Sequence, residues 1–474
     1  MSMVVQHNMQ AANANRMLGV TTSAQSKSTE KLSSGYKINR AADDAAGLTI
    51  SEKMRKQIRG LDKASSNAQD GVSSVQTAEG ALTEVHSMLQ RMNELAVQAS
   101  NGTNSKDTDR KAIQDEIDQL NTEIDRVAET TKFNEIYLLK GDDGEKTINL
   151  NAHDAGLKGT LVDNGSGKAT FTMKELSVGD SVSIGGKNYT IGSTAADAQK
   201  IVTGQEKAGG KVTVNGVEYT YNDTDKKWKD AAGADVQIGT GAAAAAGKIV
   251  IGDGDKVSDG TTTLTAMTDK KDATGAAKAD GVDDNDNSVI SAEKAYSLAK
   301  DELVAANHIG DTENTAAVDQ DTTNKNVFTI TTGSAKVANT LSFSLHVGAD
   351  ADMTNKITVD IDTMNSANLG IKGLNVTDKN GTAATYAIDA ISDAISKVSS
   401  QRSALGAVQN RLEHTIDNLD NISENTSSAE SRIRDTDMAK EMVNYSKNNI
   451  LAQAGQSMLA QANQSNQGVL SLLQ

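Results

Sequence analysis

The sequence VQTAEGALTEVHSMLQRMNELAVQA at residues 75–99 decides the fold class. Its apolar side chains recur at steps of seven, three and four, which places them on one face of an α-helix; they are Val75, Leu82, Val85, Leu89, Met92, Ala96 and Ala99. The face is narrow, and an amphipathic helix of this kind cannot bury its apolar stripe alone. The stretch therefore predicts a long helix that needs a helical partner.

Further helical patterns lie outward from this stretch. After a break at Asn101-Gly102, apolar residues recur over 113–127, and near the other end they recur over 388–398, 405–422 and 450–474. Because each stripe is narrow, the most economical arrangement pairs N-terminal with C-terminal helices, which places the two ends of the chain side by side. The rival arrangement, in which each half pairs with another chain, stays open, because periodicity does not name the partner.

The middle of the chain has a different pattern. Between residues 151 and 339, Gly, Thr, Val and Asp dominate and apolar residues alternate, as is typical of β-strands. Residues 211–221 predict a hairpin that turns at Asn215-Gly216, a dipeptide that suits a type I′ turn. Residues 181–191 predict a second hairpin, which turns at Gly185-Gly186.

The expected fold class is mainly α, with paired, coiled-coil-like N- and C-terminal helices and an inserted β-rich outer region, an α+β multidomain chain. An alanine run at 241–247 is either a flexible connection or a short helix.

Composition supports long helices and suggests export. Of the 474 residues, 37% are hydrophobic and 3% aromatic, so burial has to come largely from small and aliphatic side chains. The chain has no Pro and no Cys, so it has neither prolyl isomerisation nor disulfides to wait for. This suits a protein that travels unfolded and folds on arrival. The alternative, that long helices exclude Pro, does not account for its absence from the Gly-rich middle.

The net charge of −16 argues against a nucleic-acid partner, which would require phosphate neutralisation. No run of apolar residues approaches the length of a membrane span, so membrane insertion is not expected. The N-terminus has neither a basic start nor a continuous apolar stretch. Any export is therefore expected to proceed without a cleaved signal peptide.

Ordered motifs occur at both ends of the chain. They are LSSGYKIN at 32–39, ADDAAGL at 42–48, NAQDG at 67–71, QTAEGAL at 76–82, RMNELAVQ at 91–98 and FN at 133–134, then ID at 388–389, RL at 411–412, NL at 418–419, ESRIRDTD at 430–437 and QGVLSLL at 467–473. In this order and at these spacings the motifs closely resemble those of bacterial flagellins. Residues 345–361 are similar to a β-hairpin that many flagellins carry in their inner domain.

The resemblance implies a non-enzymatic structural subunit that self-polymerises into the extracellular filament of the bacterial flagellum for swimming motility. It implies three parts: residues 1–42 with 436–474 as terminal helices that line the filament core, residues 43–150 with 340–435 as an inner helical bundle with the hairpin, and residues 151–339 as a variable surface-exposed insert. Implied partners are other copies of the chain, a flagellar export chaperone, and hook- and cap-associated proteins. Alternatives are a minor hook–filament junction protein and a filament subunit whose insert binds a ligand.

Two sets of site residues follow from the resemblance. The apolar residues of the termini are expected to mediate polymerisation; they are Val4, Val5, Leu18, Leu32, Ile450, Leu459, Val469, Leu470, Leu472 and Leu473. A face of the helix at 75–99 is expected to contact neighbouring subunits and to match the segment bound by vertebrate Toll-like receptor 5. Its residues are Gln90, Arg91, Glu94, Leu95 and Gln98. Helical spacing places the last four on one face, away from the apolar seam, and the resemblance adds Gln90.

No catalytic, cofactor or metal site is expected. The six His residues are scattered without metal-ligand spacing, and no nucleophile or phosphate-binding motif occurs. Residues 283–294 begin like a calcium loop, but Ser288 and Lys294 stand where the loop requires Gly and Glu. We therefore expect an acidic turn before a helix at 291–306. The basic run Lys53, Arg55, Lys56 and Arg59 is expected to be a solvated face or a subunit contact.

Overall fold

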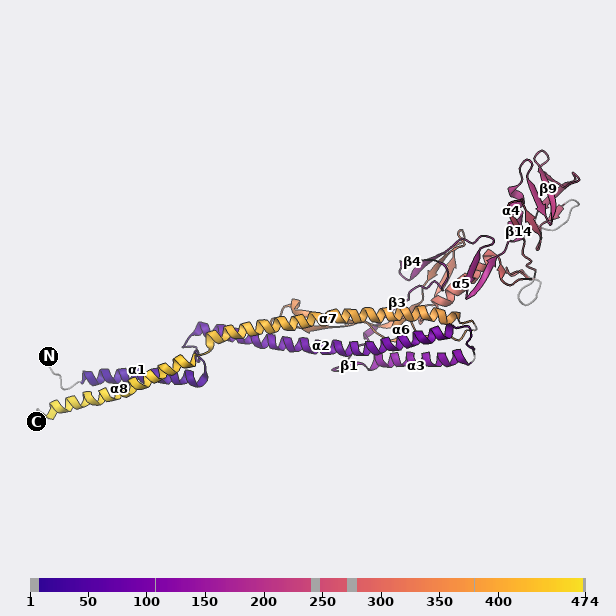
Figure 1. The fold of residues 1–474 in the computed structure, drawn as a ribbon. Helices are drawn as coiled ribbons and strands as arrows, with labels where there is room; N and C mark the ends of the chain where they lie inside the picture. The colour runs from indigo at the N-terminus through magenta and orange to yellow at the C-terminus, as the bar shows by residue number, and fades with distance from the viewer. Residues whose placement is uncertain (1–7, 107, 240–247, 271–278, 379, 472–474) are drawn as a thin grey trace. The chain divides into compact units, whose positions relative to one another are not determined.

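The computed structural model describes residues 8–106, 108–239, 248–270, 279–378 and 380–471. Long helices form both ends of the chain: α1 (Met9–Ser34), α2 (Ala45–Ser100), α3 (Asp109–Thr130), α7 (Thr382–Arg434) and α8 (Met438–Ser471). The strands lie mainly in the sequence between α3 and α7, as Figure 1 shows. The predicted fold class, mainly α with an inserted β-rich region, is confirmed. The alanine run at 241–247 lies outside the described residues.

The helical seam predicted from residues 75–99 is confirmed, since all seven of its apolar residues are buried. α2 ends at Ser100, where the Asn101-Gly102 break was predicted, and α3 follows with Ile113, Ile117 and Ile124 buried. The two patterns at 388–398 and 405–422 form one continuous helix, α7.

The chain folds into two compact units. Unit 1 comprises Met1–Val75, Phe343–Val359 and Gly406–Gln474, and unit 2 comprises Gln76–Ser342 and Asp360–Leu405. Helices α2 and α7 each contribute one part to each unit.

In unit 1 the first part of α2 packs against the last part of α7. β19 (Leu341–His346) pairs with β20 (Lys356–Ile361), with the short 3₁₀ helix η1 (Met353–Asn355) before β20, so the hairpin predicted at residues 345–361 is confirmed. Ala68 of α2, Leu412 of α7 and Ile357 of the hairpin share one buried cluster. The Asn67 amide also donates a hydrogen bond to the His346 carbonyl oxygen at 3.0 Å.

Unit 2 contains the β-rich region, whose first core lies around one helix. A four-stranded sheet has the order β16 (Ala317–Gln320), β17 (Val327–Thr331), β5 (Lys168–Met173), β4 (Gly159–Gly165), and a three-stranded sheet has the order β15 (Val289–Ile290), β7 (Lys187–Ile191), β6 (Ser181–Ile184). These strands share a core with α5 (Ala292–Asn307), including Phe171, Phe328 and Tyr296. The hairpin predicted at 181–191 and the helix predicted at 291–306 are both confirmed.

A second core lies between a seven-stranded sheet and α4 (Ala195–Gly204). The strand order is β12 (Lys248–Val250), β11 (Asp235–Gly239), β10 (Lys227–Lys229), β9 (Val217–Asn222), β8 (Lys211–Val214), β13 (Lys256–Ser258), β14 (Thr263–Thr265). The predicted hairpin β8–β9 turns at Asn215 and Gly216, whose φ values of 51° and 86° fit a type I′ turn. The single Trp, Trp228, is buried in this core.

Two pairs of strands and one short helix also belong to unit 2. β1 (Lys132–Phe133) pairs with β2 (Ile136–Tyr137), and β3 (Asp142–Asn149) pairs antiparallel with β18 (Ser334–Asn339). The short helix α6 (Ser366–Leu369) packs near β18, where Ala367 joins Val337 and Leu150 in a small buried cluster.

Candidate assembly surface

Helices α1 and α8 lie side by side, as Figure 1 shows. The partly or fully shielded positions of each helix recur at steps of three and four, the spacing of a coiled-coil seam. In α1 they include Ala11, Ala14, Leu18, Thr21, Gln25, Ser28 and Leu32, and in α8 they include Glu441, Tyr445, Asn448, Ala452, Gly455, Leu459 and Ala462. The seam is therefore built mainly from small and polar side chains.

Small residues let the two helices approach closely. A Cβ atom added at Gly455 would lie 3.3 Å from Leu18 Cδ1. The Asn8 side chain caps α1, accepting from the Ala11 N–H at 2.9 Å, and its amide donates to the Ala462 carbonyl oxygen at 3.1 Å. The predicted pairing of the N- and C-terminal helices is thus present within one chain.

A polar contact fixes the same pair near the other end of α1. Ser28 is buried, and its hydrogen bond is the main cause that lowers the pKa of Glu441 below its usual value. Because Glu441 lies in the first turn of α8, the positive end of the helix dipole also stabilises its charged carboxylate.

Most of the large apolar side chains of this helix pair lie outside the seam and face solvent. Val443 is 68% exposed, Ile450 66% and Met9 75%. Others that are more than a third exposed are Met17, Val20, Met438, Met442, Leu451 and Met458. Among the described side chains, only Ser28 of α1 and Ala452 of α8 are buried. A helix with apolar residues around most of its circumference normally lies in a core, so this pair lacks part of its cover.

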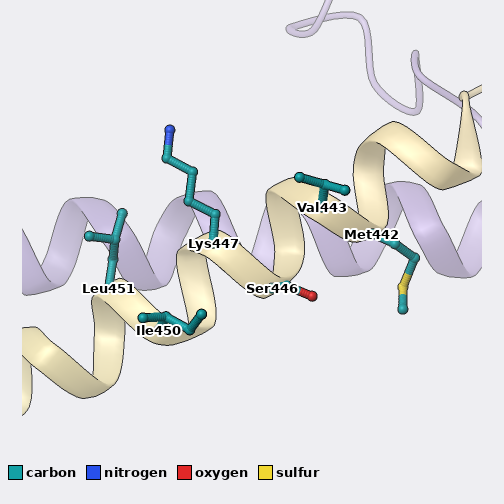
Figure 2. A pocket seen from close by; sticks show the side chains of 6 residues that line it. All are labelled: Met442, Val443, Ser446, Lys447, Ile450 and Leu451. Atoms are coloured by element: carbon teal, nitrogen blue, oxygen red, sulfur yellow. The ribbon is translucent and has the colours of Figure 1, made fainter.

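Two grooves concentrate the exposed apolar surface. Figure 2 shows the first, on α8, where Met442, Val443, Ile450 and Leu451 project from successive turns with Ser446 and Lys447. The second lies between the two helices, where Met17 of α1 and Met458 of α8 line it together with Gly455. Each encloses about 520 Å³.

The polymerisation residues predicted from the sequence fall into four groups. Leu18, Leu32 and Leu459 are partly buried in the seam, and Ile450 is exposed in the first groove. Val469 and Leu470 lie in the last turns of α8. Val4, Val5, Leu472 and Leu473 lie outside the described residues. The first groove also contains Met442, Val443 and Leu451, which are not among the residues predicted from the sequence.

Of the five residues predicted to form a receptor-binding face on α2, four are exposed. Gln90, Arg91, Glu94 and Gln98 are exposed, as expected. Leu95 is not, since it is only 2% exposed, and its expected position away from the core was wrong. The exposed apolar residue beside Gln90 and Glu94 is instead Val97, at 52%.

Ion pairs hold Arg91 on this face. Its Nε lies 2.9 Å from Glu116 Oε1 of α3, and a terminal nitrogen lies 3.2 Å from Glu94 Oε2. Hydrogen bonds to Glu116 and then Glu94 raise the pKa of Arg91, so the guanidinium stays charged. The face presents a fixed cation between two carboxylates.

The acidic turn before α5 uses its carboxylates for local hydrogen bonds. Asp283 accepts from the backbone N–H groups of Thr268 and Asn285, both at 2.8 Å, and Ser291 caps α5.

Within the described ranges, no group of three or more His, Asp or Glu side chains is placed to hold a metal ion. In the same part of the chain, no helix has the length and hydropathy to cross a membrane.

Comparison with known proteins agrees with the motifs at both ends. The model of the bacterial flagellin N-terminal helical region matches residues 5–143, and that of the C-terminal helical region matches residues 388–473. A flagellin of Clostridium tyrobutyricum is 39% identical over 468 residues, covering 98% of this chain and all (100%) of that protein.

Other relatives extend the match over the whole chain. Flagellin C of Vibrio cholerae is 36% identical and covers 100% of both chains, and a flagellin of Bacillus subtilis is 35% identical and covers 99% of this chain and 100% of its own. Among solved structures, FliC from Burkholderia pseudomallei has 19% identity and a TM-score of 0.23, and covers 72% of this chain and 99% of its own. The flagellar hook-associated protein-3 from Legionella pneumophila has 14% identity and a TM-score of 0.32, and covers 81% of this chain and 98% of its own. From the full-length sequence matches, this chain belongs to the bacterial flagellins, the structural subunits of the flagellar filament.

Proposed function

We propose that the α1–α8 pair is the surface through which this chain polymerises, and that the chain is a main subunit of the filament rather than a junction protein. One observation carries the proposal: most of the large apolar side chains of the pair, such as Val443 and Ile450, face solvent, while the seam is built mainly from small and polar residues. Burial of one such side chain is worth about 1.5–3 kcal/mol. Several of them buried between copies would provide a strong driving force for assembly.

Seeded assembly tests this proposal. Purified full-length protein is added to short filament seeds and followed by electron microscopy, beside a variant that lacks residues 438–474. The full chain is expected to extend the seeds, and the truncated chain is expected not to, because it lacks α8. Extension by the truncated chain would overturn the role of the pair. A full chain that binds the seed ends once and stops would indicate a junction protein.

We also propose that a vertebrate innate receptor, Toll-like receptor 5, recognises the exposed face of α2. The support is the fixed position of Arg91 between Glu94 and Glu116, with Gln90, Val97 and Gln98 exposed on the same helix. An arginine held in place loses little conformational entropy on binding, which favours a role as an interaction hot spot.

Surface plasmon resonance with the receptor ectodomain tests this second proposal. Arg91→Ala is expected to weaken binding about tenfold or more, the range of an arginine hot spot. The matched control is Arg126→Ala, because Arg126 is an exposed arginine paired with Glu123 on α3. An equal affinity for the wild type and Arg91→Ala would remove the assignment.

Export partners form a third part of the proposal. The exposed apolar groove on α8, with Met442, Val443 and Leu451, would require cover before assembly. We propose that an export chaperone covers it and that hook- and cap-associated proteins meet the same helix pair at the filament ends. Loss of chaperone binding in a chain that lacks residues 438–474, measured by calorimetry, is the expected result.

The three-part division predicted from the sequence is kept as a proposal. It assigns residues 1–42 with 436–474 to the filament core, 43–150 with 340–435 to the inner domain, and 151–339 to the surface-exposed insert. Limited proteolysis of the monomer is expected to remove the first part before it cuts the others, because α1 and α8 bury almost no side chains. First cuts inside 43–150 would argue against this division.

A further inference from the structure

Unit 1 carries two charged stripes of opposite sign on two different helices. The basic stripe lies on α2 and consists of Lys53, Lys56, Arg59 and Lys63. The acidic stripe lies on α7 and consists of Glu413, Asp417, Asp420 and Glu424. All eight residues are exposed.

Helical spacing aligns the members of each stripe. The basic residues follow one another at steps of three, three and four, and the acidic residues at steps of four, three and four, so each set lies along one side of its helix. At about 1.5 Å of rise per residue, the basic stripe is about 15 Å long and the acidic stripe about 16 Å. The two stripes therefore match in length and in number of charges.

The chain does not neutralise the basic stripe. Within the described ranges, none of its four residues forms an ion pair within 4 Å, and all four are exposed. Glu52 lies just before the basic stripe on α2, but its carboxylate pairs with Arg434 at 2.8 Å. Asp70 follows Lys63 at a distance of two helical turns and marks the end of the basic surface.

The acidic stripe is likewise left charged. Across the residues that the structure places, its four carboxylates have no cationic partner within 4 Å. Asp420 accepts a hydrogen bond from the Ser65 hydroxyl at 3.0 Å, and Glu413 accepts one from the Gln409 amide at 2.9 Å. Both donors are neutral, so neither cancels the charge.

We propose that the basic stripe of one copy docks against the acidic stripe of the next copy in the filament. The proposal rests on the filament function and adds the pair of surfaces that sets the register between neighbours. A contact between two different surfaces of identical subunits can repeat from copy to copy along an open lattice when the rotation between copies does not close a ring. Complementary charges accelerate association and suppress misaligned contacts. A nucleic acid would use the basic stripe alone, and the net charge of −16 opposes it.

Charge reversal with rescue tests the proposal. One variant carries Lys56→Glu and Arg59→Glu, a second carries Asp417→Lys and Glu424→Lys, and a third carries all four changes. Rates of seed elongation are measured at low salt, about 0.05 M NaCl, where screening is weak. Each of the first two variants is expected to elongate at least tenfold more slowly than wild type. An equimolar mixture of them, and the third variant alone, are expected to recover to within about threefold.

A matched control and a salt series complete the experiment. Lys187→Glu with Lys207→Glu makes the same charge change on two exposed lysines of the insert that form no ion pair with any described residue, and it is expected to leave the rate unchanged. The difference between wild type and the first two variants is expected to shrink as NaCl approaches about 1 M, where the screening length is about 3 Å. Circular dichroism verifies that every variant keeps its helices.

The outcomes separate this proposal from the proposed function. If the reversed variants elongate like wild type, or if the mixture and the fourfold variant stay as slow as each reversed variant, the stripe pairing is overturned while the filament role stands. If the wild type itself does not extend seeds, the filament role fails first.

Discussion

The guanidinium of Arg434 lies 4.8 Å from the centre of the Tyr36 ring, and that of Arg55 lies 5.7 Å from the same ring. Tyr36 follows the left-handed Gly35 that ends α1, and Arg434 is the last residue of α7. Next to this stack, the Thr436 N–H donates to the Gly35 carbonyl oxygen at 2.9 Å. The two segments that lead to the terminal helices are thus held together at one aromatic ring.

Removal of the Tyr36 ring is expected to loosen this connection. A cation–π contact is worth about 0.5–2 kcal/mol, so Tyr36→Ala should accelerate amide exchange at Thr436 by about tenfold. Tyr36→Phe keeps the ring and should remain within about threefold of wild type. Hydrogen exchange followed by mass spectrometry measures both. Equal rates in the two variants would show that the ring does not hold the segments.

Arg110 is expected to be essential to the stability of unit 2. Its side chain is buried, and the guanidinium donates to the carbonyl oxygens of Ala99 at 2.8 Å, Asp378 at 3.0 Å and Asn101 at 3.1 Å. It therefore satisfies acceptors at the C-terminal end of α2 and in the segment before α7. Carbonyl groups that lose a charged donor in a buried site remain desolvated.

Arg110→Met should therefore lower the free energy of unfolding by about 3–5 kcal/mol, measured by urea denaturation with far-UV circular dichroism. Lys111→Met is the control, because Lys111 is the exposed neighbour and should change stability by less than about 0.5 kcal/mol. A small effect of Arg110→Met would mean that water replaces the guanidinium.

Leu95 is expected to act through the core and not through a partner. Because it is 2% exposed, Leu95→Ala should destabilise unit 2 by about 2–5 kcal/mol. Val97→Ala, at an exposed position of the same helix, should cost less than about 1 kcal/mol. If receptor binding weakens in Leu95→Ala at a temperature where the protein is fully folded, Leu95 has a direct role after all.

The error at Leu95 shows what helical periodicity can and cannot predict. Spacing identified the seven seam residues of α2 because a stripe at steps of three and four must face a partner. It could not show that α2 has two partners: Arg91 pairs with Glu116 of α3, and Glu79 pairs with Arg402 of α7. Two neighbours bury a wider arc than one, and Leu95 lies in the additional part of that arc.

The topology of the sheets could not be predicted from the sequence, for a different reason. The hairpin β8–β9 could be predicted because Asn215-Gly216 determines its turn locally. The parallel pairing of β15 with β7 joins residues about a hundred positions apart, and nothing local specifies it. The same holds for the two charged stripes, since their exposure and lack of partners depend on how α2 and α7 pack.

Alkaline pH is expected to destabilise the core around α5 through Tyr386. This residue is buried, and its hydroxyl donates a hydrogen bond to Glu302. Burial, and then the bond to Glu302, raise the pKa of Tyr386 above its usual value of 10.0. Because the folded-state pKa is higher than the unfolded one, this contribution to stability is complete below pH 10 and is lost as the pH rises further.

The free energy of unfolding, measured by urea denaturation, should therefore fall between about pH 10 and pH 11.5, by at most about 1.4 kcal/mol per pH unit from this residue. Tyr386→Phe is the control, because it cannot ionise and should show a shallower fall. Burial also raises the pKa of Tyr219 and of Tyr221, so only the difference between wild type and Tyr386→Phe reports on Tyr386. Parallel pH profiles would contradict the assignment.

Polar substitution of the α8 groove is expected to raise the critical concentration for filament growth. Val443 and Ile450 are 68% and 66% exposed in the single chain, so their replacement by Ser should leave its folding nearly unchanged. If both side chains are buried between copies in the filament, each replacement removes about 1.5–3 kcal/mol of assembly free energy. The double variant should then need at least a hundredfold higher protein concentration to assemble. Val162→Ser in the insert, where Val162 is 51% exposed, is the matched control and should assemble like wild type. Sedimentation of filaments at a series of protein concentrations measures the threshold. An unchanged threshold in the double variant would place the growth interface on other residues of the helix pair.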